Sequence, residues 1–475
     1  MTTDKVTLAV LGASGDLTSR LLLPGLATLL AGRPDLDVHL VGAATETYTD
    51  EEWKTRVREA LTTNACPDHA RERVVAGTRY TTLDVTSPEQ MATFLASLSD
   101  DRPVVLYFAL PPAVTIAACR VLAQLDLPDD LRLALEKPFG ESEESAREFN
   151  RLLTSFVREE QIFRVDHFLG RATVLNIVGL RFGNRVLSRV WSSDDIESIE
   201  IIYDEQIALE DRAGYYDKAG ALRDMLQSHL LLVMAMLMME APSRVDAVEL
   251  RDLIGHLLRA TRLYGDDPVA SSHRARYTAG DVDGREIPSY VDERGVDPAR
   301  CTETLSEITV EVANARWKGV PVTLRSGKAL GGRREIVVRF RPVAHVPVGF
   351  VDDPAPDVLR FGMNPETLSL RMATSGAEGA FDFSTVDLQA ELGDSEMRPY
   401  GEILSYIIAG DPLLSVRGDV AEECWRIVDP VLAAWAADEV PLEEYPVGSA
   451  GPEQWLRAAA GEDGHPGSRR GLPAE

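Results

Sequence analysis

Short, continuously apolar segments alternate with helical patterns over about residues 1–140, and this alternation constrains the fold more than any other feature of the sequence. Segments that are apolar at every position are typical of strands buried on both faces of a parallel sheet. Helical patterns follow the first two apolar segments, up to about Ala31 and over Glu51–Leu61. We therefore expect a doubly wound parallel sheet. The apolar segments are Val6–Leu11, Val38–Ala44, Val104–Leu110 and Leu131–Glu136.

The pattern changes after about residue 180, where strand-like segments follow one another through turns. Four further segments have helical periodicity, namely Ala219–Met239, Ala247–Leu263, Tyr400–Ile408 and Val420–Ala437. This arrangement predicts a mostly antiparallel sheet flanked by helices. The fold class expected is thus α/β plus α+β, with a Rossmann-type dinucleotide-binding domain over 1–180, a second domain over 181–460 and a flexible tail over 461–475. The expected strands of the second domain are Ser198–Tyr203, Glu307–Val312, Val320–Leu324, Glu335–Phe340 and Thr367–Met372.

The chain is strongly acidic, with a formal net charge of −27 over 475 residues. This charge argues against nucleic acid or an anionic membrane as partner, because both favour an excess of Lys and Arg. The longest apolar run, Leu230–Met239, is about half the roughly 20 residues that cross a bilayer. No targeting segment is recognisable, so we expect a soluble, cytoplasmic protein. The four cysteines are scattered and are interpreted as buried, reduced side chains: Cys66, Cys119, Cys301 and Cys424.

Three glycine-rich or basic segments follow predicted strands. Gly12 and Gly15 lie between a strand and a helix, where exposed backbone N–H groups can bind a phosphate, although an ordinary turn has the same pattern. Lys137 follows a buried strand, which places it where ligands bind in open α/β sheets unless it is a solvated loop residue. Lys328 lies in the basic cluster Arg325–Arg334, which suits an anionic group or a solvated turn.

Two further segments combine titratable side chains. The segment Arg164–Arg171 contains two arginines, Asp166 and His167, a combination that suits either a site or an accidental surface pair. His229 lies on an apolar helical pattern, where a histidine is usually a satisfied core residue. Asp224 precedes it by five residues, about 1.4 turns of an α-helix.

Together these segments resemble the glucose-6-phosphate dehydrogenase family, and the resemblance runs from about Val6 to Trp455. The chain repeats the family's motifs in order, and so many motifs in sequence order are highly specific. The matching segments are Gly12-Ala-Ser-Gly15-Asp-Leu, Ala109–Pro112, Glu136–Gly140, Arg164-Val-Asp-His-Phe-Leu-Gly-Arg171, Gly214-Tyr-Tyr-Asp, Arg223–His229, Gly327-Lys-Ala-Leu and Trp425-Arg-Ile-Val-Asp-Pro.

The resemblance implies oxidation of the sugar at C1 to a lactone, with hydride passing to NAD or NADP. It makes His229 the catalytic base and Asp166 the residue that orients it. It assigns no metal, and it implies a homodimer or homotetramer assembled through the sheet domain. The implied substrate-binding residues are Lys137, His167, Arg171, Glu205, Asp224, Lys328 and Arg333. The implied cofactor-binding residues are Gly12, Ser14, Gly15, Asp16, Leu17, Thr45, Pro111 and Lys137.

Four positions depart from the family pattern. Arg171 replaces a lysine, Ser228 an asparagine, and Met363 falls where a glutamine is common. The fourth departure is Thr45, which is followed by Glu46 where an arginine usually holds the 2′-phosphate of NADP. An acid near the ribose favours NAD, so we expect a weakened preference for NADP. Arg20 in the first helix is a candidate replacement for the missing cation.

Two alternatives to a sugar-phosphate dehydrogenase stay open at this point. One is a dehydrogenase of an unphosphorylated or modified sugar, which the changes at Arg171 and Met363 would permit. The other is a paralogue that binds sugar phosphate without turnover. The presence of both Asp166 and His229 speaks against the second alternative, because a protein that only binds needs no oriented base.

Overall fold

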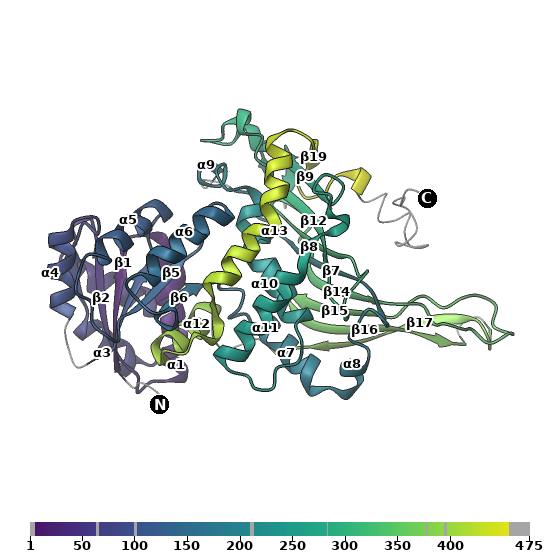
Figure 1. The fold of residues 1–475 in the computed structure, drawn as a ribbon, viewed down its shortest axis with the longest axis horizontal. Coiled ribbons are helices and arrows are strands. Elements are labelled where there is room, and N and C mark those ends of the chain that lie inside the picture. The colour runs from purple at the N-terminus through teal and green to yellow at the C-terminus, as the bar shows by residue number, and fades with distance from the viewer. Residues whose placement is uncertain are drawn as a thin grey trace. The chain divides into compact units, whose positions relative to one another are not determined.

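The computed structural model describes residues 5–62, 66–98, 102–209, 213–282, 284–376, 379–393 and 397–455 (Figure 1). The chain forms two compact units. The first comprises residues 1–187, 232–259 and 393–426, and the second comprises 188–231, 260–392 and 427–475. The expected tail, 461–475, lies outside the described residues. No helix among the described residues is long and apolar enough to cross a membrane.

The first unit contains a sheet in the order β18-β6-β5-β4-β1-β2-β3. All neighbouring strands pair in parallel except β18 (Ser415–Val416), which pairs antiparallel with β6 at one edge. β1 is buried from Val6 to Leu11, as a strand covered on both faces must be. The predicted doubly wound sheet is therefore confirmed. Its parallel strands are β1 (Lys5–Leu11), β2 (Asp37–Ala44), β3 (Arg79–Thr82), β4 (Val104–Phe108), β5 (Arg132–Glu136) and β6 (Ile162–Val165).

Helices α1 (Leu23–Gly32), α2 (Asp50–Thr62), α3 (Asp68–Gly77) and α12 (Pro399–Ala409) share one apolar core with these strands. A π-helical segment, Thr18–Leu22, precedes α1, and Pro24 lies in the first turn of α1. Helical residues run without a break from Asp16 to Gly32, so Pro24 lies inside this helix and interrupts its hydrogen-bond ladder just after the π-helical segment. The unit's other helices are α4 (Pro88–Leu98), α5 (Pro112–Leu122), α6 (Glu143–Thr154), α7 (Ala172–Gly183), α10 (Leu231–Met238), α11 (Ala247–Ala260) and the first half of α13 (Gly418–Ala436).

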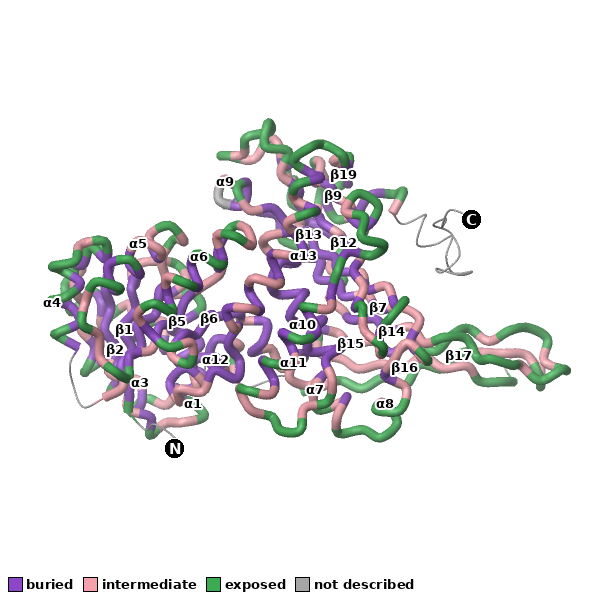
Figure 2. Tube along the Cα trace, viewed as in Figure 1, coloured by how far each residue is buried: buried purple, intermediate pink, exposed green. Residues whose placement is uncertain are grey.

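The second unit contains a large, mostly antiparallel sheet in the order β17-β16-β15-β14-β7-β13-β12-β9-β19. Two pairs, β13 with β7 and β19 with β9, are parallel. Figure 2 shows β17 exposed along most of its length, whereas every second residue of β12 is buried. The strands are β7 (Ile196–Asp204), β9 (Ser272–Thr278), β12 (Leu305–Val312), β13 (Val322–Gly327), β14 (Arg334–Phe340), β15 (Val358–Met363), β16 (Glu366–Ser375), β17 (Phe383–Glu391) and β19 (Leu442–Pro446).

One predicted helix is longer than the structure allows. The helix expected over Ala247–Leu263 ends at Ala260, and Thr261–Leu263 forms strand β8. β8 pairs antiparallel with β12, with Leu263 opposite Val310. The helical periodicity continues through these three residues, but pairing with the sheet provides their backbone hydrogen bonds instead.

Candidate active site

Five adjacent parallel strands bring the predicted residues of the first unit to one edge of its sheet. In the order β6-β5-β4-β1-β2, these strands end just before Asp166, Lys137, Ala109, Gly12 and Thr45. The carboxyl ends of parallel strands meet at a common edge, where open α/β sheets bind their ligands. The strand order therefore explains why motifs far apart in sequence lie next to one another.

The turn after β1 has the form of a phosphate-binding turn. Gly12 has φ +86°, and an added Cβ would lie 2.2 Å from the carbonyl oxygen of Ala109. The backbone N–H groups of Gly12 and Ala13 donate to the Ala43 carbonyl over 2.8 and 3.1 Å. The next helix begins at Asp16, so its N-terminus follows the turn directly. The absence of a side chain at Gly12 lets the turn pass close to Ala109. The helix start fits the pyrophosphate of a dinucleotide, which Ser14, Gly15 and Asp16 would contact.

An acidic residue lies beside this turn. The Ser14 hydroxyl donates to the Glu46 carboxylate over 2.7 Å, and the Thr45 hydroxyl donates to the same oxygen over 3.4 Å. The hydrogen bond from Ser14 lowers the pKa of Glu46, so this carboxylate is ionised at neutral pH. Glu46 thus carries its negative charge at the end of β2, on the strand next to the phosphate-binding turn.

The cation next to the turn is a residue that the sequence did not single out. Arg56 of α2 donates from Nη2 to the Ser14 carbonyl over 2.7 Å, and its guanidinium lies 5.9 Å from the centre of the Tyr48 ring. Arg20, the expected replacement, is 75% exposed and pairs with Asp16 at 3.8 Å. Arg56 lies within an ordinary amphipathic helix pattern, so no sequence signal distinguishes it.

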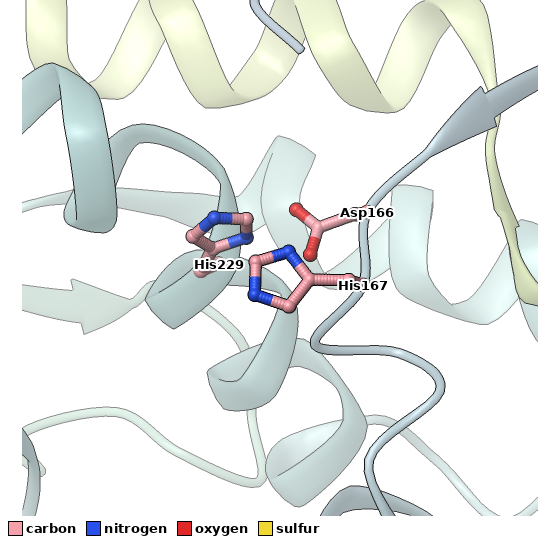
Figure 3. A group of neighbouring side chains, drawn as sticks. All are labelled: Asp166, His167 and His229. Carbon is pink, nitrogen blue, oxygen red and sulfur yellow. The ribbon is translucent and has the colours of Figure 1, made fainter. Parts of the chain in front are cut away.

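Asp166, His167 and His229 form a compact group of side chains (Figure 3). One ligand atom from each lies within 4.8 Å of the others. Asp166 is fully buried and His229 is 5% exposed, so both are largely removed from water. The Phe168 N–H donates to Asp166 Oδ1 over 3.0 Å and fixes that carboxylate. A carboxylate beside an imidazole can select its tautomer and orientation, which is what a histidine base requires.

His229 lies on a π-helical segment, Leu222–Leu230, which continues as α10. Hydrogen bonds in a π-helix join residues five apart, and such segments occur frequently at functional sites. Asp224 precedes His229 by five residues, so the π geometry brings both side chains towards one face of the helix. The Glu303 carboxylate accepts from the Leu222 N–H over 3.0 Å at the start of the segment. Ser228, one of the four departures, is buried in the same segment.

His167 and Arg171, from the Arg164–Arg171 segment, pack against aromatic rings. The His167 ring stacks on the Tyr400 ring, with centroids 5.9 Å apart and planes 16° apart. The Arg171 guanidinium lies 4.4 Å from the centre of the Phe168 ring. These contacts orient an imidazole and a cation that follow β6 directly.

Lys328 is held between two acids in the second unit. Its ammonium forms ion pairs with Glu205 and, at 3.4 Å, with Asp224. Burial opposes the charged ammonium, but Asp224 and Glu205 outweigh that effect and raise the pKa of Lys328. The ammonium also lies 5.6 Å from the centre of the Tyr216 ring. The structure thus brings Glu205, Asp224 and Lys328 together as a compact polar cluster.

Two other residues of the second unit have different surroundings. Arg333 pairs with Glu335 at 2.8 Å and with Glu200 at 3.8 Å, and its side chain is 48% exposed. Met363, at the end of β15, is 2% exposed. Met363 is therefore a core residue of the sheet.

Family models cover almost the whole chain. Residues 9–176 match the glucose-6-phosphate dehydrogenase NAD-binding domain, and residues 178–465 match the C-terminal domain of the same family. A glucose-6-phosphate 1-dehydrogenase of Gluconobacter oxydans is 37% identical over 97% of both chains. One of Treponema pallidum is 33% identical over 97% of this chain and 95% of its own.

Solved structures agree with this assignment. The glucose-6-phosphate 1-dehydrogenase of Mycobacterium avium superposes with a TM-score of 0.84 at 31% identity, covering 99% of both chains. A glucose-6-phosphate dehydrogenase in complex with glucose 6-phosphate superposes with a TM-score of 0.87 at 27% identity, covering 96% of this chain and 97% of its own.

The parallel sheet with a glycine turn after its first strand, together with the matched family models and relatives, makes this chain a nicotinamide-dependent oxidoreductase that acts on a CH–OH group. The chain belongs to the glucose-6-phosphate dehydrogenase family.

Proposed function

We propose that this protein oxidises glucose 6-phosphate at C1 to 6-phosphogluconolactone and transfers the hydride to NAD or NADP. The observation that carries the proposal is the buried group of Asp166 and His229, because a carboxylate beside an imidazole supplies an oriented base. The family membership and the substrate complex of a similar structure support the choice of substrate. This chemistry is that of the oxidative pentose phosphate pathway.

His229 and Asp166 each have one task in this mechanism. His229 removes the proton of the C1 hydroxyl as the hydride leaves C1, so the sugar carbon becomes a carbonyl carbon. Asp166 accepts a hydrogen bond from the other ring nitrogen and stabilises the imidazolium that forms. The nicotinamide, when bound, accepts the hydride.

The remaining polar residues bind and orient the substrate. His167 and Arg171 hold the phosphate with charge-assisted hydrogen bonds, which are stronger than neutral ones. Lys137 contacts both substrate and cofactor from the end of β5. Glu205, Asp224, Lys328 and Arg333 bind sugar hydroxyls or the phosphate side; Glu205, Asp224 and Lys328 form one cluster of ion pairs.

The cofactor turn includes Gly12, Ser14, Gly15, Asp16 and Leu17, with Pro111 beside it. At the ribose, Glu46 carries a negative charge that favours the free 2′-hydroxyl of NAD over the 2′-phosphate of NADP. We therefore propose a weakened NADP preference with efficient use of NAD. Thr45 contacts the ribose and provides no cation.

The division into a dinucleotide-binding domain over 1–180 and a substrate and oligomerisation domain over 181–460 remains a proposal. The boundary between the two matched family models, at residues 176 and 178, supports it. A cytoplasmic homodimer or homotetramer is proposed on the same family basis.

The test is a parallel assay of purified protein with glucose 6-phosphate and with glucose, each with NAD and with NADP, followed by absorbance of the reduced cofactor. We expect turnover of the phosphorylated sugar with both cofactors and at least comparable efficiency with NAD. Turnover of glucose at equal efficiency would contradict the assignment of a sugar phosphate. Binding of glucose 6-phosphate without turnover would contradict catalysis.

A further inference from the structure

Glu136 lies at the carboxyl end of β5, immediately before Lys137, and it accepts hydrogen bonds from two tyrosines. The Tyr107 hydroxyl, from β4, donates to Glu136 Oε1. The Tyr400 hydroxyl, from the start of α12, is hydrogen-bonded to the same carboxyl group. Tyr107 is 1% exposed and Tyr400 is 7% exposed. Two phenolic donors suit the ionised carboxylate, because that form only accepts hydrogen bonds.

The charged and titratable groups that face Glu136 come from four places in the first unit: Tyr107, Tyr400, Lys137 and Asp166. Burial raises the pKa of Glu136 to about 7, and the negative charge of Asp166 adds to this shift. The two tyrosine hydroxyls and Lys137 oppose it. Glu136 therefore changes its protonation state around neutral pH.

Tyr400 contacts both Glu136 and a residue of the proposed phosphate site. Its hydroxyl bonds the carboxyl group, and its ring stacks on the His167 ring with planes 16° apart. Protonation converts one carboxyl oxygen of Glu136 from an acceptor into a donor. A tyrosine hydroxyl bonded to that oxygen must then rotate or move, and the same protonation removes the negative charge next to Lys137.

We propose that Glu136 is a positioning residue that couples solution pH to binding of the sugar phosphate. When ionised, it holds Tyr400 against His167 and provides a counter-charge for Lys137; when protonated, it releases both, and the substrate binds more weakly. This inference rests on the proposed function, because it assigns His167 and Lys137 to the substrate.

The experiment measures the Kd of glucose 6-sulfate at equilibrium from about pH 5.5 to 8.5, with the NAD-saturated protein. A sulfate monoester keeps one charge throughout, unlike a phosphate with its second pKa near 6. Protonation of His167 at low pH would strengthen anion binding, so the weakening expected from Glu136 has the opposite sign. We expect the wild-type Kd to rise as the pH falls below about 7, by at most about tenfold per pH unit, the limit for one proton.

Three variants separate this coupling from a structural role. Glu136→Gln keeps the shape and removes the titration of this carboxyl group, so its Kd should no longer rise as the pH falls. Tyr400→Phe keeps the ring stacked on His167 and removes its hydrogen bond to Glu136, so the rise of its Kd at low pH should be smaller than in wild type, with only the charge next to Lys137 still titrating. Tyr107→Phe retains the link through Tyr400 and should keep the dependence with a shifted midpoint. Glu141→Gln, an exposed neighbour, is the matched control and should behave as wild type.

A wild-type pH dependence that persists in both Glu136→Gln and Tyr400→Phe overturns the inference. If Glu136→Gln fails to fold, an unchanged rise of the Kd at low pH in Tyr400→Phe still overturns the inference. The same preparations are assayed for turnover of glucose 6-phosphate. If wild-type protein turns over this sugar and the variants keep the wild-type pH profile of Kd, only the role of Glu136 is disproved. If wild-type protein neither binds nor oxidises the sugar, the proposed function is contradicted as well.

Discussion

Ser14 donates its hydroxyl to the carboxylate of Glu46 over 2.7 Å, which joins the turn after β1 to the end of β2. The two residues belong to the elements that bind the pyrophosphate and the ribose in a dinucleotide-binding sheet. In the proposed cofactor site, this negative charge would lie near the 2′-substituent of the ribose. The proposed choice of cofactor would then depend on electrostatics at Glu46.

Replacing this acid should shift the choice of cofactor. Glu46→Gln keeps an acceptor for Ser14 and removes the charge. Two unit charges about 4 Å apart in water interact by about 1 kcal/mol, so we expect kcat/KM for NADP relative to NAD to rise roughly fivefold. Glu51→Gln removes an exposed acid from the first turn of α2 and is the control. An unchanged cofactor ratio in Glu46→Gln would rule out Glu46 as the determinant.

The turn after β1 should tolerate no side chain at its first position. In Gly12→Ala the new Cβ meets the Ala109 carbonyl oxygen, and a left-handed conformation costs alanine about 1–2 kcal/mol before that contact is counted. We expect a lower free energy of unfolding and weaker binding of NAD, measured by denaturant titration and calorimetry. Gly77→Ala, at the end of α3 with open space around it, should leave both quantities nearly unchanged. Equal behaviour of the two variants would refute the role given to Gly12.

Arg171 should contribute to binding of the phosphate and little to the chemical step. A hydrogen bond to a charged group is worth about 1.5–3 kcal/mol, so Arg171→Ala should raise KM for glucose 6-phosphate by roughly 10- to 150-fold. We expect kcat to change little, because the base and its orienting carboxylate remain. Arg189→Ala, at the exposed end of α8 (Arg185–Arg189), serves as control. A loss confined to kcat would argue against phosphate binding by Arg171.

The pKa of Glu136 also predicts how stability depends on pH. Burial raises this pKa from 4.5 to about 7, so between these values the folded protein binds a proton that the unfolded chain has released. This group's contribution to stability therefore falls as pH rises from about 4.5 to about 7. Glu136→Gln should remove this fall, which is on the order of 1–3 kcal/mol. Denaturant titrations of wild type, Glu136→Gln and Glu141→Gln at several pH values measure the free energy of unfolding. If this free energy depends on pH in the same way in all three proteins, the shifted pKa is contradicted.

The sequence predicts four strands of the first unit, β1, β2, β4 and β5, because they are continuously apolar. It does not predict β3 or the buried β6. Strand β17 escapes the same reasoning, since Phe383–Glu391 is largely exposed and mixes polar with apolar residues. Thr261–Leu263 continues a helical pattern and becomes a strand only because β12 lies beside it. Such cases depend on tertiary pairing, which a local pattern does not contain.

The residues of the candidate site likewise include some that the sequence identifies and some that only the folded structure brings to the site. The order of the family motifs identifies Asp166, Lys137 and His229. Asp166 and Lys137 also follow strands, whereas His229 lies on a helix and is identified by the motif alone. Arg56 and Tyr400 carry no such mark, as each lies in an ordinary helical pattern. Their proximity to Ser14 and Glu136 arises from packing of α2 and α12 on the sheet.

Transfer of hydride from C1 is the central claim, and a deuterium label tests it most directly. Glucose 6-phosphate carrying deuterium at C1 is incubated with the protein and NAD, and the reduced cofactor is analysed by mass spectrometry. We predict one deuterium per reduced nicotinamide, at a rate that falls about 10²–10⁴-fold in His229→Asn while the Kd for the sugar stays within a few-fold of wild type. Reduced cofactor without deuterium, or an unaffected rate in His229→Asn, would contradict the account.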